Sequence, residues 1–241
     1  MCKVSETSSQ RGGMMSTDFG ALFWALAGGG VVAAVGYGLL YLHRPESMAR
    51  AIAKTLFMAG LTAAFASIGA PWVVLLALAA AAIGDFVLAF DNEAILPLGI
   101  LAFLICQLSY LYIFWTHRAG GADLDTTLVR YAAMALVLAT AIGFLIWMGP
   151  KLGPMAAAVI PYSIAICAMA CAAFLLPWRG WPAMVGVVSF LTSDFVLSAE
   201  LFRLPPDAPA RRITVPVVWW TYVAAQVLIV WGLVRVLLEE G

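Results

Sequence analysis

Eight apolar runs, each about as long as a lipid bilayer is thick, fill most of this chain and most constrain its fold. A helix needs about 20 predominantly apolar residues to cross the hydrocarbon core of a membrane. Backbone polar groups find no water there, so a spanning segment must be a helix or part of a closed barrel. Because the runs lack the alternation of barrel strands, we predict an all-α, polytopic membrane helix bundle with about eight transmembrane helices.

The predicted helices have boundaries set by polar, glycine and proline residues. They cover residues 19–42, 49–69, 72–90, 94–115, 128–149, 152–176, 181–202 and 215–238, with Pro154 and Pro161 inside the sixth. Residues 1–18 are predicted to be a disordered polar tail, and residues 19–238 a single eight-helix transmembrane domain. An even number of spans places both termini on one side of the membrane.

Charge is scarce and balanced in this sequence. Only 11% of the 241 residues are charged, and 64% are hydrophobic. Soluble domains carry about a quarter charged residues. The 13 basic and 13 acidic residues cancel, so there is no basic field for nucleic acid. We therefore expect membrane lipid, and no nucleic acid, as a partner.

Two aspartates interrupt apolar runs within a repeated tetrapeptide. Asp-Phe-Val-Leu begins at Asp85 in the third predicted helix and again at Asp194 in the seventh. A charge near the bilayer centre costs roughly 3 kcal/mol on insertion scales, so such residues are candidates for function. The two helices lie four apart and run in the same direction. This relation fits a 4+4 parallel repeat, or a chance recurrence in a sequence rich in Leu, Val and Phe.

Other polar side chains fall at a similar depth when the helices are measured at about 1.5 Å per residue. They are Lys54, Gln107, Tyr110, Tyr162, Tyr222 and Gln226. We predict that they form a polar pocket open to one side and bind substrate there. Simpler roles stay open, because lysine can snorkel to the interface and Tyr and Gln often join neighbouring helices. Glu200 is expected near the interface, solvated or paired with Arg203.

The remaining polar residues exclude several chemistries. The two histidines, His43 and His117, are predicted at opposite sides of the membrane, so neither a zinc site nor a Ser-His-Asp set can form in the bundle. We predict no metal and no cofactor. The two aspartates are left for acid–base chemistry, because burial and a second carboxylate let one hold a proton while the other stays ionised.

The order of these motifs resembles the YhhN-like lysoplasmalogenases over roughly residues 20–238. The resemblance is carried by Lys54, Gly84-Asp85, Tyr110, Pro161-Tyr162, Ser193-Asp194 and Tyr222 with Gln226. It implies an integral, multi-pass protein of the bacterial inner membrane. Family members commonly have His three residues before the fourth-helix Tyr, where this chain has Gln107, and Lys-Pro in the second helix, where it has Lys54-Thr55.

The resemblance also implies a reaction. Family members cleave the vinyl-ether bond of lysoplasmalogens to a fatty aldehyde and glycerophosphoethanolamine or glycerophosphocholine. Asp85 and Asp194 match the family's proposed catalytic pair, with Asp/Asp general acid–base catalysis on a lysophospholipid substrate. Lys54 would meet its phosphate. Two alternatives stay open: a proton-coupled transporter that uses the aspartates as a relay, and a non-enzymatic lipid-binding membrane protein.

Overall fold

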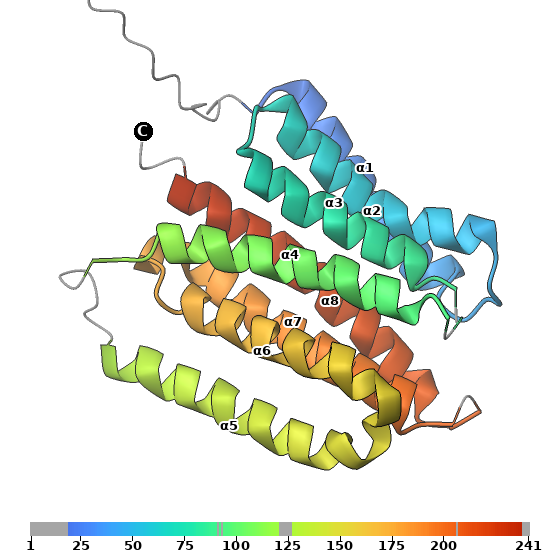
Figure 1. The fold of residues 1–241 in the computed structure, drawn as a ribbon. Coiled ribbons are helices and arrows are strands. Elements are labelled where there is room, and N and C mark those ends of the chain that lie inside the picture. Colours follow the sequence, from blue (N-terminus) through green and yellow to red (C-terminus); the bar gives the residue numbers. More distant parts are fainter. Residues whose placement is uncertain (1–18, 91, 93, 121–126, 206, 238–241) are drawn as a thin grey trace, which may run out of the picture.

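Eight α-helices that alternate in direction make up the computed structural model, which describes residues 19–90, 92, 94–120, 127–205 and 207–237 (Figure 1). The helices are α1 (Ala21–Leu40), α2 (Met48–Ser67), α3 (Trp72–Val87), α4 (Leu96–Thr116), α5 (Thr127–Leu152), α6 (Ala156–Ala173), α7 (Trp181–Phe202) and α8 (Arg211–Leu237). Helix α1 begins and α8 ends at the same end of the bundle, called here the terminal end. The other end is called the distal end.

The helix boundaries differ from the predicted ones by up to four residues. Helix α3 ends at Val87, three residues early, and α8 begins at Arg211, four residues early. The prediction that Pro154 lies inside the sixth helix is wrong. Pro154 lies instead in a 3₁₀ turn, η2 (Gly153–Met155), because Gly153 adopts a φ of +49° that ends the preceding helix.

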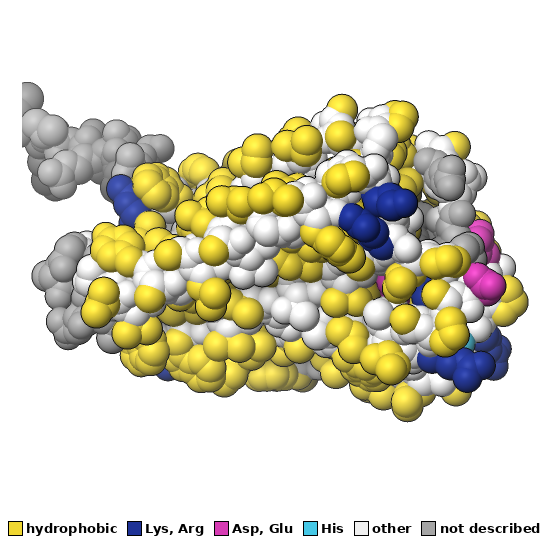
Figure 2. All heavy atoms as spheres, turned by 90° about the horizontal axis from the view of Figure 1, so that it is seen from below, with side chains coloured by type: hydrophobic (Ala, Val, Ile, Leu, Met, Phe, Trp, Pro, Cys, Tyr) yellow, Lys and Arg dark blue, Asp and Glu magenta, His cyan; other side chains and the backbone are white. Residues whose placement is uncertain are grey.

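The helices are those of a multi-pass membrane protein. Six segments of the described chain are long and apolar enough to cross a bilayer; one of them, Thr127–Ala173, contains both α5 and α6. Helix α3 has only 16 residues. Figure 2 shows hydrophobic side chains along the flank and most charged ones near the two ends. Eight membrane crossings and a 4+4 repeat stay predictions.

Small residues let the helices approach closely. Gly30 of α1 lies against Gly60 of α2, where an added Cβ would meet the Gly30 Cα at 2.9 Å. Gly232 of α8 lies against α7, and a Cβ there would come 2.4 Å from the Ala183 nitrogen. Close backbone approach of this kind stabilises helix pairs in lipid, where apolar side chains gain little from leaving the solvent.

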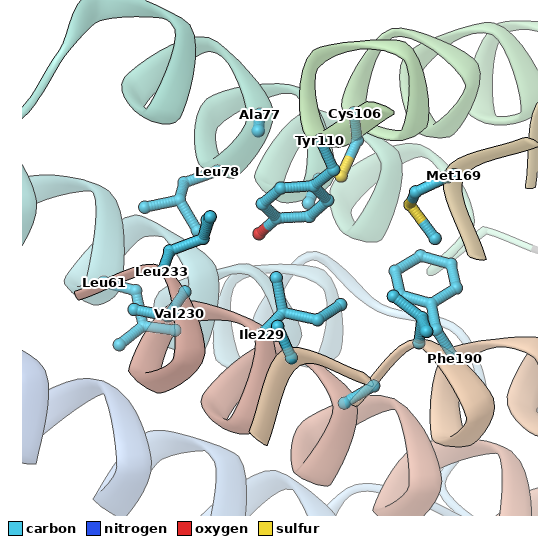
Figure 3. Close-up of a cluster of buried hydrophobic side chains, with 14 of the residues drawn as sticks. Leu61, Ala77, Leu78, Cys106, Tyr110, Met169, Phe190, Ile229, Val230 and Leu233 are labelled. Carbon is cyan, nitrogen blue, oxygen red and sulfur yellow. The ribbon is translucent and has the colours of Figure 1, made fainter. Parts of the chain in front are cut away.

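A hydrophobic core runs through the interior of the bundle and reaches the lining of the cavity described below. Side chains from α2, α3, α4, α6, α7 and α8 converge there, and the Tyr110 ring lies among them (Figure 3). Helix α5 contributes one buried residue, Ala141, to this core, packs mainly on α6 and exposes most of its surface. Arg130 in its first turn donates to the carbonyls of Phe174 (2.7 Å) and Leu176 (2.5 Å), which satisfies groups left free where α6 ends.

Candidate active site

A cavity of about 1570 Å³ lies at the distal end, and both aspartates line it. Five of the eight residues predicted to form the site line this cavity: Lys54, Asp85, Tyr162, Asp194 and Tyr222. Their side chains come from α2, α3, α6, α7 and α8. The common cavity predicted for Asp85 and Asp194 is therefore present, although their catalytic role stays a prediction.

Asp85 is held in the last turn of α3 by contacts from two other helices. Its side chain is almost fully buried, at 1% exposure. The Tyr222 hydroxyl donates to its Oδ2 at 2.8 Å, and the Lys54 ammonium lies 3.8 Å from its Oδ1. A neighbouring cation favours the ionised carboxylate. Lys54 therefore does not simply snorkel outward, because it forms an ion pair with Asp85.

Asp194 lies near the middle of α7 and receives only neutral donors among the described residues. The Tyr162 hydroxyl donates to its Oδ2 in a short hydrogen bond, and the Gln107 amide donates to the same oxygen at 3.4 Å. Tyr162 follows Pro161 within α6. The two aspartates thus share one pattern, a tyrosine donor, and differ in the charge beside them.

The residue before each aspartate explains how its helix packs. Gly84 faces the Phe103 ring of α4, whose nearest carbon would lie 2.6 Å from an added Cβ. Ser193 donates to the Val218 carbonyl of α8 at 2.9 Å. In Gly-Asp and in Ser-Asp, the first residue therefore contacts a neighbouring helix and the aspartate lines the cavity, which the sequence alone does not reveal.

Three predicted site residues lie behind the cavity and do not line it. Gln107, Tyr110 and Gln226 are fully buried, and Gln107 reaches the cavity only through Asp194. The Tyr110 hydroxyl donates to the Gln226 Oε1 at 2.8 Å, which is the role of a polar joint between α4 and α8. The prediction that they line the pocket is wrong in this respect, because shared depth does not determine which way a helix face points.

Glu200 corrects a second prediction. It is buried at 5% exposure and lines the cavity, so it is not a solvated interface residue. Arg203, its expected partner, lies over the Trp147 ring with its guanidinium carbon 4.5 Å from the ring centroid. Arg211 donates to the Glu200 carbonyl at 2.7 Å and so joins the end of α7 to the start of α8.

The cavity mouth carries charged residues that sequence reasoning missed as a group. They are Arg44, Glu46, Arg50, Lys151, Asp207, Arg211 and Arg212, from four separate parts of the chain. The sequence offered one signal for this group, because each of these residues lies at or near the end of a predicted span on the same side of the membrane. Among the described residues, no three His, Cys, Asp or Glu side chains come together as a metal site.

The comparison with known proteins assigns the family. The profile of the YhhN family matches residues 49–233, which include every cavity-lining residue of the predicted site. The chain belongs to the YhhN family. Within that match lie both Gly84-Asp85 and Ser193-Asp194, so the resemblance predicted from these motifs is confirmed.

Two curated relatives of this YhhN-family chain carry the same description. Proteins of Mycobacterium bovis and Mycobacterium tuberculosis, each described as a lysoplasmalogenase, are 33% identical to it over 161 residues. The aligned segment covers 65% of this chain and 58% of each relative. The chain thus aligns with under two thirds of the length of these relatives. No solved structure matches it significantly.

Proposed function

We propose that this chain is a lysoplasmalogenase-type hydrolase, which cleaves the vinyl-ether bond of a lysophospholipid in the bacterial inner membrane. The observation that carries the proposal is that Asp85 and Asp194 line one cavity in a bundle whose buried side chains are mostly apolar. The mycobacterial relatives described as lysoplasmalogenases support the reaction class. The products would be a fatty aldehyde and glycerophosphoethanolamine or glycerophosphocholine.

The chemistry needs one acid and one base. Protonation of the vinyl β-carbon gives an oxocarbenium ion, and water then adds at the carbon bonded to the ether oxygen. The resulting hemiacetal loses its hydroxyl proton, the bond to the glycerol oxygen breaks, and that oxygen takes up a proton. One water is consumed, and the acid recovers its proton. Two carboxyl groups, one protonated and one ionised, supply each of these transfers.

The surroundings favour opposite roles for the two aspartates. Asp85 lies beside the Lys54 ammonium, so it is the ionised group that stabilises the cation and activates water. Asp194 accepts only from the neutral Tyr162 and Gln107 among the described side chains, so it is the proton donor. Both tyrosine hydroxyls orient the carboxyl group that they contact.

The direct test is aldehyde release from choline and ethanolamine lysoplasmalogens, with an ester-linked lysophospholipid beside them. Asp85→Asn and Asp194→Asn should each lower kcat by about 10² to 10⁴, the usual contribution of general acid–base catalysis. Thr192→Val is the matched control, because Thr192 lies on α7 with its side chain exposed and contacts only its own helix. Full aldehyde release in either Asn variant would contradict the proposal.

The residual activity of the two variants separates their roles. A general acid and a general base together give a bell-shaped dependence of rate on pH. Asp194→Asn should remove the fall in rate on the alkaline side, and Asp85→Asn the fall on the acidic side. Exchanged results would reverse the assignment. Proton-driven uptake into liposomes without any product would indicate a transporter, and binding without either would indicate a lipid-binding protein.

A further inference from the structure

The mouth of the cavity carries side chains of both charges that form no ion pair with the residues that the structure describes. Arg44, Lys151 and Arg212 line it, and none of the three forms an ion pair or a side-chain hydrogen bond with a residue that the structure describes. The Arg44 guanidinium only lies over the Tyr41 ring, 5.1 Å from its centroid. All three side chains are exposed, and they come from the α1–α2 connection, the end of α5 and the start of α8.

Two other cations at the mouth have structural roles. Arg50 donates to the Ala89 carbonyl at 3.3 Å, just after α3 ends. Arg211 donates to the carbonyls of Pro205 (3.0 Å) and Glu200 (2.7 Å), between α7 and α8. Lys54, deeper in the cavity, forms its ion pair with Asp85. Arg44, Lys151 and Arg212 are therefore the cations at the mouth that are available to a ligand, whereas Lys54 already pairs with Asp85.

Two carboxylates share the mouth with these cations. Glu46 and Asp207 are exposed, line the same cavity and form no ion pair with any described residue. They lower the net positive charge that an inorganic dianion would meet at the mouth. A ligand that carries one negative and one positive charge a few bonds apart would meet complementary charges in both sets.

We infer that the cavity mouth binds a zwitterionic phosphodiester headgroup, with the phosphate at Arg44, Lys151 and Arg212 and the ammonium at Glu46 and Asp207. This rests on the proposed function, which places a lysophospholipid in the cavity with its reactive bond near the aspartates. The headgroup then lies towards the distal opening, and the hydrocarbon chain lies deeper. The inference assigns the headgroup of the proposed substrate to these five residues.

Binding of lipids that cannot be cleaved tests the inference separately from catalysis. The probes are three 1-O-alkyl glycerols, which have no vinyl bond: one with phosphocholine, one with phosphate alone and one with no headgroup. In non-ionic detergent, the wild type should bind the phosphocholine probe tightest. Its affinity should weaken as salt rises, because exposed charges are screened. The affinity for the headgroup-free probe should be insensitive to salt.

Charge variants identify the residues responsible. The triple variant Arg44→Gln, Lys151→Gln, Arg212→Gln should lose roughly 10-fold or more in affinity for both phosphate-containing probes, as expected for loss of charge-assisted contacts. Its affinity for the headgroup-free probe should not change. Glu46→Gln with Asp207→Asn should weaken only the phosphocholine probe. Arg118→Gln is the matched control, because Arg118 lies at the other end of the bundle, next to Trp115.

The outcomes separate the inference from the proposed function. Equal binding of all three probes by wild type and triple variant overturns the inference, even if lysoplasmalogen is cleaved. Charge-dependent binding without cleavage of any lysoplasmalogen supports the inference and refutes the proposed function. Tighter binding of the phosphate-only probe than of the phosphocholine probe overturns the assignment of Glu46 and Asp207.

Discussion

Each aspartate is joined to a tyrosine that comes from a different helix. Tyr222 reaches Asp85 from α8, and Tyr162 reaches Asp194 from α6. The Tyr222 ring is itself fixed by aromatic neighbours, with centroids 5.8 Å away at Phe103 and 6.0 Å away at Phe190. Packing of this kind leaves the hydroxyl little freedom, so the Asp85 carboxyl keeps one orientation towards the cavity.

Removing the Tyr222 hydroxyl tests whether that orientation matters. Tyr222→Phe should lower kcat for aldehyde release by roughly 10-fold or more, because a hydrogen bond to a charged group is worth about 1.5–3 kcal/mol. KM should change little, since the headgroup binds elsewhere. Tyr112→Phe is the control, as Tyr112 is exposed on the outer face of α4. A kcat equal to that of the wild type would show that Tyr222 only packs.

The sequence indicates which polar residues line the cavity more readily than it indicates their partners. Asp85 and Asp194 stand out because charge is rare in apolar runs, and both line the cavity. The sequence predicts Tyr110 and Gln226 at a depth similar to that of the aspartates, but they bond to each other behind the cavity. Helical spacing shows which side chains share a face, and only tertiary packing determines what that face meets.

Helices α7 and α8 form one of the closest pairs, and glycines set their separation. An added Cβ at Gly186 would lie 2.8 Å from the Ile229 nitrogen, and one at Gly232 would lie 2.4 Å from the Ala183 nitrogen. The obstacles are backbone atoms, which cannot rotate away. Because Asp194 lies on α7 and Tyr222 on α8, this separation also bears on the shape of the cavity.

Gly232→Ala should therefore destabilise the bundle. Forcing the two backbones apart should lower the free energy of unfolding by about 1–3 kcal/mol, the usual effect of overpacking. Gly143→Ala in α5 is the matched control, because a Cβ there meets nothing within 4 Å. That change should be neutral or slightly stabilising, since Ala favours a helix by about 1 kcal/mol over Gly. Unfolding in a denaturing detergent series measures both, and equal midpoints would contradict the argument.

Boundaries were predictable only where a local signal exists. Ser47 caps α2 by accepting from the Arg50 amide at 3.2 Å, close to the predicted start at residue 49. Helix α8 begins earlier than predicted because Arg211 is held by the Glu200 carbonyl, a tertiary contact. The break between α5 and α6 lies at Gly153, where φ is positive, and not at Pro150, which lies inside the last turn of α5.

At the scale of the whole molecule, the two halves of the chain each supply one aspartate to the cavity. Helices α1–α4 carry Asp85 and α5–α8 carry Asp194, and the halves meet where α4 packs on α6 and α1 on α8. The tyrosine pairing does not repeat between the halves. Under a shift of four helices, Tyr222 of α8 corresponds to the α4 position near Tyr110, which bonds to Gln226.

This division of the cavity makes the protein a candidate for genetic complementation. Residues 1–120 and 121–241, expressed as separate polypeptides, each keep their helices but hold only one of the two carboxyl groups. The contacts between the two fragments include the Tyr222–Asp85 hydrogen bond and a 3.1 Å hydrogen bond from the Trp219 indole to the Ala34 carbonyl. Independently inserted helices can associate afterwards in the bilayer.

Co-expression of the two fragments should therefore restore aldehyde release that neither fragment has alone, and Asp85→Asn in the first fragment should abolish it. Activity in one fragment alone would mean that a single carboxyl group suffices. If activity depends on both fragments, the rate of aldehyde release in a living cell would measure how many bundles have assembled.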